Sequence, residues 1–168
     1  LPVTDTHIDK EATINEEIDK LRLKATSSLM SRQDVIVVSS VSSIYGLGLP
    51  ENYKQGSVSI SLNQKIDRRR LLLKLINIHY SRNDQVLERG NIRVRGDIIE
   101  IFPAYEDNSY RIELFDDQIE NITSFDPLTG EIINVFKKLV IFPAKHFITK
   151  KETITRVVEE IRIELEER

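Results

Sequence analysis

Arginine is the residue type whose spacing in this sequence points most clearly to chemistry. Four arginines fall within one short stretch, at Arg82, Arg89, Arg93 and Arg95. In the string Asn91–Arg95, the two-residue period of a strand puts both arginines on one face and the intervening apolar residues on the other. That face is either a solvated surface balanced by neighbours such as Glu100 or Glu113, or a patch that binds an acidic partner. The planar guanidinium group suits the second role because it pairs bidentately with carboxylate or phosphate.

The familiar catalytic patterns are missing from this sequence. It contains no phosphate-binding loop of the Gly-x-x-x-x-Gly-Lys type and no Gly-x-Gly-x-x-Gly string. The three histidines, His7, His79 and His146, are isolated and lack the spacing of metal ligands. The serine cluster at 39–43 has no neighbouring histidine and no nucleophile elbow. We therefore expect no catalytic residue, no metal site and no cofactor in the chain itself.

Composition narrows the class of protein. The 168 residues are 40% hydrophobic and 30% charged, with a formal net charge of −3 and no cysteine. These values exclude a disordered chain, a disulfide framework and a wholly basic nucleic-acid coat, but they allow a local basic patch. No apolar run reaches the roughly 20 residues of a membrane span, and an intracellular, cytoplasmic location fits the lack of cysteine. The chain starts on Leu1 and stops within a helical pattern, so we expect a piece of a longer protein.

The first third of the chain reads as part of an α/β domain. Residues 1–12 are polar and β-like, and residues 14–32 have the period of an amphipathic helix. The predicted buried stripe of that helix is Ile14, Ile18, Leu21, Ala25 and Leu29. The β-branched run Val35–Val38 predicts a strand buried on both faces of a parallel sheet. Small residues and turn formers then predict a domain boundary near Gly48–Pro50.

The remainder reads as an α+β domain. Residues 57–62 alternate as a half-buried strand, and Asp67 is placed to cap a helix that runs to about Tyr80 with His79 on its inner side. The run Arg68–Arg70 at the start of this helix is interpreted as solvated. Short strands follow between residues 86 and 142, with a turn at Asp126–Gly130. This spacing predicts an antiparallel β-sheet with packed helices, and a further helix is predicted from Thr149 onward.

Several long strings of the sequence resemble the UvrB family of bacterial nucleotide excision repair. The strings are Val35–Gly48, Tyr80–Asp84, Arg89–Asp97, Ile101–Ala104 and Phe125–Gly130. The segment Asp5–Glu11 also looks like the returning arm of that family's β-hairpin, with His7 where the family usually carries an aromatic residue. The resemblance runs essentially from end to end.

The resemblance implies an internal slice of a superfamily 2 helicase core. Residues 1–48 would form the hairpin arm and the end of the first ATPase domain. Residues 49–145 would form the UvrA-interaction domain (domain 2), and residues 146–168 would begin the next helicase domain. The family's UvrA-docking residues carry over to Arg82, Arg93, Arg95, Arg111 and Glu113. DNA contacts of the arm and loop carry over to His7, Lys10, Ser40 and Ser42.

The implied function is docking on UvrA, so that the damage-verifying subunit is loaded on damaged DNA. For the full-length protein the resemblance also implies UvrC as a partner, ATP with magnesium as cofactors, and a place in an excinuclease with a DNA-dependent ATPase. The family's ATP-binding and acidic magnesium motifs are absent here, so the chain alone is not expected to be an enzyme. Two alternatives stay open: the related module of the transcription-repair coupling factor, and a domain that binds DNA directly through its arginines.

Overall fold

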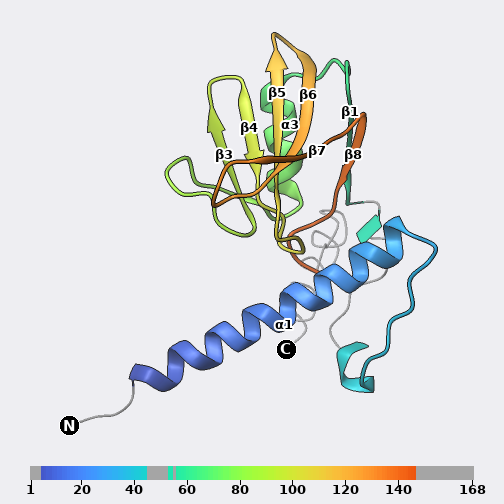
Figure 1. Ribbon diagram of the computed structural model, residues 1–168, viewed down its shortest axis with the longest axis vertical. Coiled ribbons are helices and arrows are strands. Elements are labelled where there is room, and N and C mark those ends of the chain that lie inside the picture. The colour runs from blue at the N-terminus through green and yellow to red at the C-terminus, as the bar shows by residue number, and fades with distance from the viewer. Residues whose placement is uncertain (1–4, 45–52, 55, 147–168) are drawn as a thin grey trace, which may run out of the picture.

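A six-stranded sheet forms the main body of the molecule, and the long helix α1 (Asp5–Ser31) runs past one end of it (Figure 1). The computed structural model describes residues 5–44, 53–54 and 56–146. The strands lie in sequence order and comprise β2 (Ser81–Arg82), β3 (Asn91–Arg95), β4 (Ile98–Ile101), β5 (Ser109–Phe115), β6 (Gln118–Phe125) and β7 (Ile132–Val135). All neighbours are antiparallel except β2 and β3, which are parallel. The predicted α+β class with a mainly antiparallel sheet is therefore confirmed.

A second, two-stranded sheet pairs segments that are far apart in the sequence. Strand β1 (Val58–Ser61) runs antiparallel to β8 (Lys138–Ile141). The alternation predicted for residues 57–62 is confirmed, because Val58 and Ile60 are buried whereas Ser59 between them is exposed. This pairing closes the domain by joining its first strand to its last.

Helix α3 (Arg68–Asn77) covers one face of the large sheet, behind the strands in Figure 1. Asp67 caps it as predicted, because its Oδ1 accepts a hydrogen bond of 2.8 Å from the Arg70 amide. Leu71 and Leu75 of the helix are fully buried. They belong to one apolar core with the inward-facing isoleucines of the sheet, which include Ile92, Ile99, Ile101, Ile112 and Ile122. The opposite, outer face of the sheet contains Arg93, Glu100 and Arg111.

Two local predictions around these elements have different outcomes. The turn Asp126–Gly130 is confirmed, since the Asp126 carboxylate accepts from two turn amides and Gly130 has a φ of 77°. The placement of His79 on the inner face of the helix is wrong. The helix ends at Asn77, so the helical period no longer applies, and His79 is exposed with a φ of 71°.

The N-terminal segment is a single long helix, α1 (Asp5–Ser31). The helix predicted for residues 14–32 is confirmed, but the β-like conformation predicted for residues 1–12 is wrong from Asp5 onward. A strand needs a neighbour for its backbone hydrogen bonds, and no strand in the described residues pairs with this segment. A helix satisfies those bonds internally, and Lys10–Ala12 are good helix formers.

Three residues of the apolar stripe predicted for α1 face solvent. Ile18, Leu21 and Leu29 are 49%, 59% and 50% exposed, whereas Leu23 is 5% exposed. Leu23 packs with the aromatic side chains Tyr53, Tyr105 and Phe142. The helix therefore attaches to the end of the sheet through a different face from the one that its period favours.

The run Val35–Val38 forms no strand, and Ile36, Val37 and Val38 of this run are exposed. Ile36 and Val38 are 91% and 94% exposed. A buried parallel strand needs neighbours on both edges and layers on both faces, and none of these is present among the described residues. A short 3₁₀ helix, η1 (Val41–Ile44), follows this run. The predicted boundary at Gly48–Pro50 and the helix predicted from Thr149 lie outside the described residues.

Among the described residues, no helix has the length and apolar character that crossing a membrane requires.

Candidate functional site

A row of charged side chains crosses the outer face of the large sheet. The strand register places Arg93 of β3 opposite Glu100 of β4, and Glu100 opposite Arg111 of β5. Arg93 donates from Nε to Glu100 Oε2 at 2.7 Å, and Arg111 donates to Oε1 from Nη2 at 2.9 Å and from Nε at 3.1 Å. The Glu100 side chain is only 7% exposed, against 19% for Arg93 and 26% for Arg111. We call these three residues the arginine–glutamate row.

Antiparallel pairing explains the row. Opposite residues on one sheet face lie within side-chain reach, and like charges placed directly opposite each other would be destabilising. Glu100 separates the two arginines and offers one carboxylate oxygen to each. Removing one partner from a buried ion pair is costly because the remaining charge stays desolvated. The row therefore holds Arg93 and Arg111 in fixed positions instead of leaving them as flexible surface chains.

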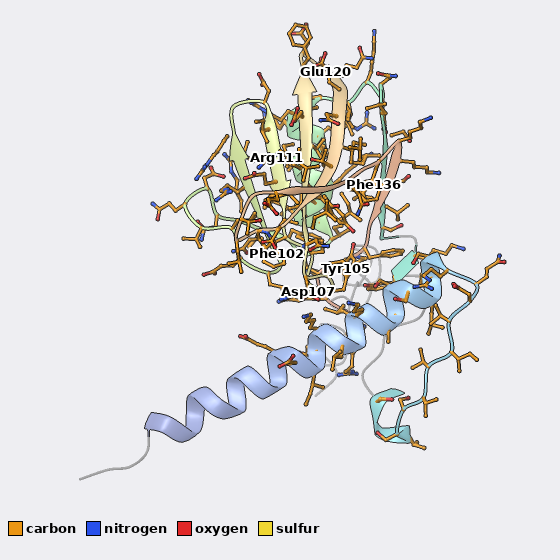
Figure 2. All side chains as sticks on the ribbon, viewed as in Figure 1. Phe102, Tyr105, Asp107, Arg111, Glu120 and Phe136 are labelled. Carbon is orange, nitrogen blue, oxygen red and sulfur yellow. The ribbon has the colours of Figure 1, made fainter. Side chains whose placement is uncertain are left out.

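Two of the arginines lie over the faces of aromatic rings. The Arg111 guanidinium lies 4.5 Å from the centroid of the buried Phe125 ring, and Arg89 lies 5.0 Å from that of Phe102. A guanidinium over an aromatic face gains a cation–π attraction. Figure 2 places Arg111 over the middle of the sheet, well away from the end that meets α1. Packing of this kind orders the Arg111 side chain further.

The next row across the same face contains two charged side chains that have no partner among the described residues. Arg95 of β3 lies opposite Ile98 of β4, which lies opposite Glu113 of β5. Arg95 is exposed, Glu113 is half-buried, and Ile98 between them is 37% exposed. Within the described part of the chain, neither charged side chain takes part in a hydrogen bond or an ion pair. Both remain available to another molecule.

Arg82 lies at the edge of the sheet, on β2. Its guanidinium is bidentate on Asp84, with contacts of 2.7 Å, 3.0 Å and 3.1 Å. Asp84 also accepts a hydrogen bond of 3.0 Å from the Val94 amide. The hydrogen bond from Arg82, followed by that from Val94, lowers the pKa of Asp84. Arg82 is nonetheless 48% exposed and has room for a further contact.

The structure thus brings four of the predicted docking residues onto one sheet face, with Arg82 at the adjoining edge. The residues predicted to contact DNA lie elsewhere. His7 and Lys10 are in the first turns of α1, and Ser42 is in η1. Ser40 is exposed in the loop before η1, where its carbonyl accepts from the Ser43 amide at 3.0 Å. The described residues do not gather these four into one site with the arginines.

The docking residues predicted from the sequence leave out two side chains that order this surface, Glu100 and Phe125. The sequence predicts Glu100 only as a neighbour that balances the arginine charges, whereas in the structure it is the buried centre of the row. The sequence pattern does not predict the contact between Phe125 and Arg111, because that contact depends on the pairing of β5 with β6. No three His, Asp or Glu side chains in the part of the chain that the structure describes gather closely enough to hold a metal ion.

A second charged cluster joins α1 to the end of the sheet. Asp107 contacts Lys20 directly, with Lys24 at 3.8 Å and Arg89 at 3.3 Å. The hydrogen bond from Lys20 lowers the pKa of Asp107; burial opposes this shift, and the hydrogen bond from Arg89 adds to it. In Figure 2, Asp107 and Tyr105 lie together at the end of the sheet that faces α1. This cluster connects elements, and it lies apart from the arginine–glutamate row.

Comparison of the sequence with known protein families identifies the family of this chain. Residues 58–147 match the family described as the UvrB interaction domain. The chain belongs to the UvrB interaction domain family. All eight strands, α3 and the arginine–glutamate row lie within the matched residues, whereas α1 and η1 precede them.

Similar proteins extend the likeness beyond the interaction domain. The chain is 54% identical over 165 residues to the UvrABC system protein B of Gemmatimonas aurantiaca, covering 98% of this chain and 24% of the relative. It is 53% identical over 169 residues to the protein of that name from Carboxydothermus hydrogenoformans, covering 100% of this chain and 26% of the relative. For the Treponema denticola protein the identity is 50% over 168 residues, covering 100% and 25%. The chain thus spans about a quarter of the length of these relatives, and the resemblance to the UvrB family is confirmed.

Proposed function

We propose that the interaction domain docks UvrA through the outer face of its sheet, as part of a UvrB protein in nucleotide excision repair. The observation that carries this proposal is that an ordered row of ion pairs lies next to a row of charged side chains that have no partner among the described residues. Arg93 and Arg111 are ordered by Glu100, and Arg95 and Glu113 stand next to them without partners in the described chain. The family description, an interaction domain, and the relatives' membership of the UvrABC system support the same reading.

The chemistry of this face fits a partner with complementary charges. A carboxylate on the partner would face Arg95 or Arg82, and a basic group would face Glu113. Because the row is already ordered, binding loses less side-chain entropy than it would with free arginines. A mixed-charge surface contributes mainly orientation, specificity and association rate. Ile98, partly exposed between the open charges, adds an apolar contact at the centre.

For the whole protein, the proposal follows the division inferred from the sequence. Residues 1–48 complete the first ATPase domain, residues 49–145 form domain 2, and residues 146–168 begin the next helicase domain. The full-length protein would bind ATP and magnesium through segments outside this chain, and would act with UvrC on damaged DNA in the cytoplasm as a subunit of an excinuclease. His7, Lys10, Ser40 and Ser42 are proposed DNA contacts of that larger protein.

Calorimetric titration of the chain with UvrA from the same organism tests docking. Arg95→Glu reverses an open charge and should weaken binding by about tenfold or more, because it sets repulsion where attraction is needed. Glu113→Lys should act in the same direction. Lys138→Glu is the matched control, since Lys138 is an exposed residue of the separate β1–β8 sheet. Equal affinity of all three variants for UvrA would contradict the proposal.

The same variants separate docking from direct DNA binding. Binding through phosphates is insensitive to sequence and falls steeply with salt. If Arg95→Glu abolished binding to a duplex oligonucleotide and left the affinity for UvrA unchanged, the arginine face would be a DNA surface.

A further inference from the structure

A charged groove continues the outer face around the edge of the sheet. It encloses about 470 Å³ where the first turn of α3 approaches β2 and β3. Its lining residues are Arg68, Arg69, Leu72, Arg82, Val94 and Gly96. Arg82 is therefore shared between the groove and the predicted docking set, so the two surfaces are continuous.

The three arginines of the groove differ in how they are held. Arg68 donates to the Gly96 carbonyl at 2.6 Å and contacts Asp97 at 3.4 Å, which fixes it as a wall of the groove. Arg82 is held by Asp84. Arg69 is exposed and takes part in no hydrogen bond or ion pair within the described residues. Arg69 is therefore the one arginine lining the groove that has no partner among the described residues.

The placement of these arginines opposes local electrostatics. The first turn of α3 contains no acidic residue, and its three arginines stand at the positive end of the helix dipole. The capping residue Asp67 accepts a hydrogen bond from the Arg70 amide, and Asp97 contacts Arg68, so neither is paired with the Arg69 side chain. Local helix stability therefore does not account for the arginines at this end of α3, and Arg69 is the one of them that lines the groove without a partner among the described residues.

We propose that this groove binds an acidic peptide segment of the docking partner, one with at least two carboxylates. The inference rests on the proposed function, which supplies the partner. One carboxylate would pair with Arg69, a second would reach the exposed side of Arg82, and Leu72 and Val94 would contact the aliphatic parts of the segment. A protein segment fits better than a nucleic-acid backbone, because phosphate binding relies on many open cations. Here Asp84 and Asp97 already engage two of the three arginines.

Neighbouring arginines of α3 provide a matched pair of variants. Arg69→Glu and Arg70→Glu make the same charge change on the same turn, but only Arg69 lines the groove. Both substitutions place an acid near the helix N-terminus, where the dipole favours it, so both variants are expected to fold. In titrations with UvrA, Arg69→Glu should weaken binding about tenfold, whereas Arg70→Glu should stay within about twofold of the unsubstituted chain.

Measuring the UvrA affinity of Arg95→Glu in the same experiment distinguishes failure of the groove from failure of the proposed function. If Arg95→Glu weakens UvrA binding and Arg69→Glu does not, the groove is refuted while docking through the sheet face stands. If the unsubstituted chain does not bind UvrA, the proposed function itself fails. Equal losses from Arg69→Glu and Arg70→Glu would indicate long-range charge steering and overturn the groove. Loss of duplex-oligonucleotide binding in Arg69→Glu, with UvrA affinity kept, would reassign the groove to nucleic acid and also overturn it.

Discussion

Replacing Glu100 with glutamine should destabilise the interaction domain without changing its shape. Glu100 accepts charge-assisted hydrogen bonds on both carboxylate oxygens, one side from Arg93 and the other from Arg111. An amide can accept on its oxygen only, and its NH₂ group then faces guanidinium donors on the other side. At least one charge-assisted hydrogen bond is lost, worth about 1.5–3 kcal/mol, and a donor is left against donors at a site that is 7% exposed.

Partial rehydration limits the loss. Arg93 and Arg111 are 19% and 26% exposed, so either can turn toward water once Glu100 is neutral. We therefore expect Glu100→Gln to lower the free energy of unfolding by about 2–3 kcal/mol. Glu113→Gln is the control: it makes the same substitution on the same sheet face at a side chain with no partner in the described residues, and it should stay within about 0.5 kcal/mol.

Urea denaturation followed by tyrosine fluorescence measures both variants, because the chain has five tyrosines and no tryptophan. Urea is preferred to guanidinium chloride because it leaves ion pairs unscreened. A cost below about 1 kcal/mol for Glu100→Gln, or equal costs for the two variants, would refute the argument that the arginine–glutamate row is a buried and mutually dependent unit.

Three further predictions concern neighbouring features. Arg93→Ala should cost about 1–3 kcal/mol in urea denaturation because Glu100 loses one of its two partners, whereas Arg95→Ala should cost less than about 0.5 kcal/mol; equal costs would contradict the different roles of the two arginines. The hydrogen bond from Lys20 lowers the pKa of Asp107, so its stabilising effect is complete above the ordinary carboxyl pKa and is lost as pH falls through the lowered value. Asp107→Asn should accordingly speed hydrogen exchange in residues 16–31 at pH 7 and make little difference near pH 2, while an equal effect at both would argue against the ion-pair explanation. Burial raises the pKa of Tyr80 well above its ordinary value, so the folded state retains a proton that the unfolded state releases and stability falls as pH rises above about 10. Absorbance at 295 nm should show Tyr80 ionising only together with unfolding, and smooth titration in a chain with unchanged circular dichroism would contradict this.

The sheet domain was largely predictable because its signals are local. Alternation in residues 57–62, the Asp67 cap and the turn at Asp126–Gly130 each depend on a few adjacent residues, and each is present in the structure. The grouping of Arg93 with Arg95, and of Arg111 with Glu113, followed from the strand period alone.

What the sequence could not provide was the neighbour of each segment. The period of α1 identifies an apolar stripe. The buried apolar residue of the helix is instead Leu23, because it packs against the aromatic side chains at the end of the sheet. Val35–Val38 has the composition of a buried strand, but no strand pairs with it among the described residues, and Ile36 and Val38 are exposed. Likewise, the burial of Glu100 between two arginines depends on the register of three strands, which sequence patterns did not specify.

The most direct test of docking through the sheet face is a footprint of that face in the complex. The chain contains no cysteine, so single cysteines introduced by Asn121→Cys and Lys138→Cys report on one position each. Asn121 lies opposite Glu113 in the register of β5 and β6 and belongs to none of the predicted docking residues, whereas Lys138 lies in the separate sheet. Maleimide labelling is measured as a mass shift of the chain, with and without saturating UvrA. The account predicts that UvrA slows labelling at position 121 by about tenfold or more and leaves position 138 unchanged. Unchanged labelling at position 121 in a chain that is demonstrably bound to UvrA would contradict docking through this face.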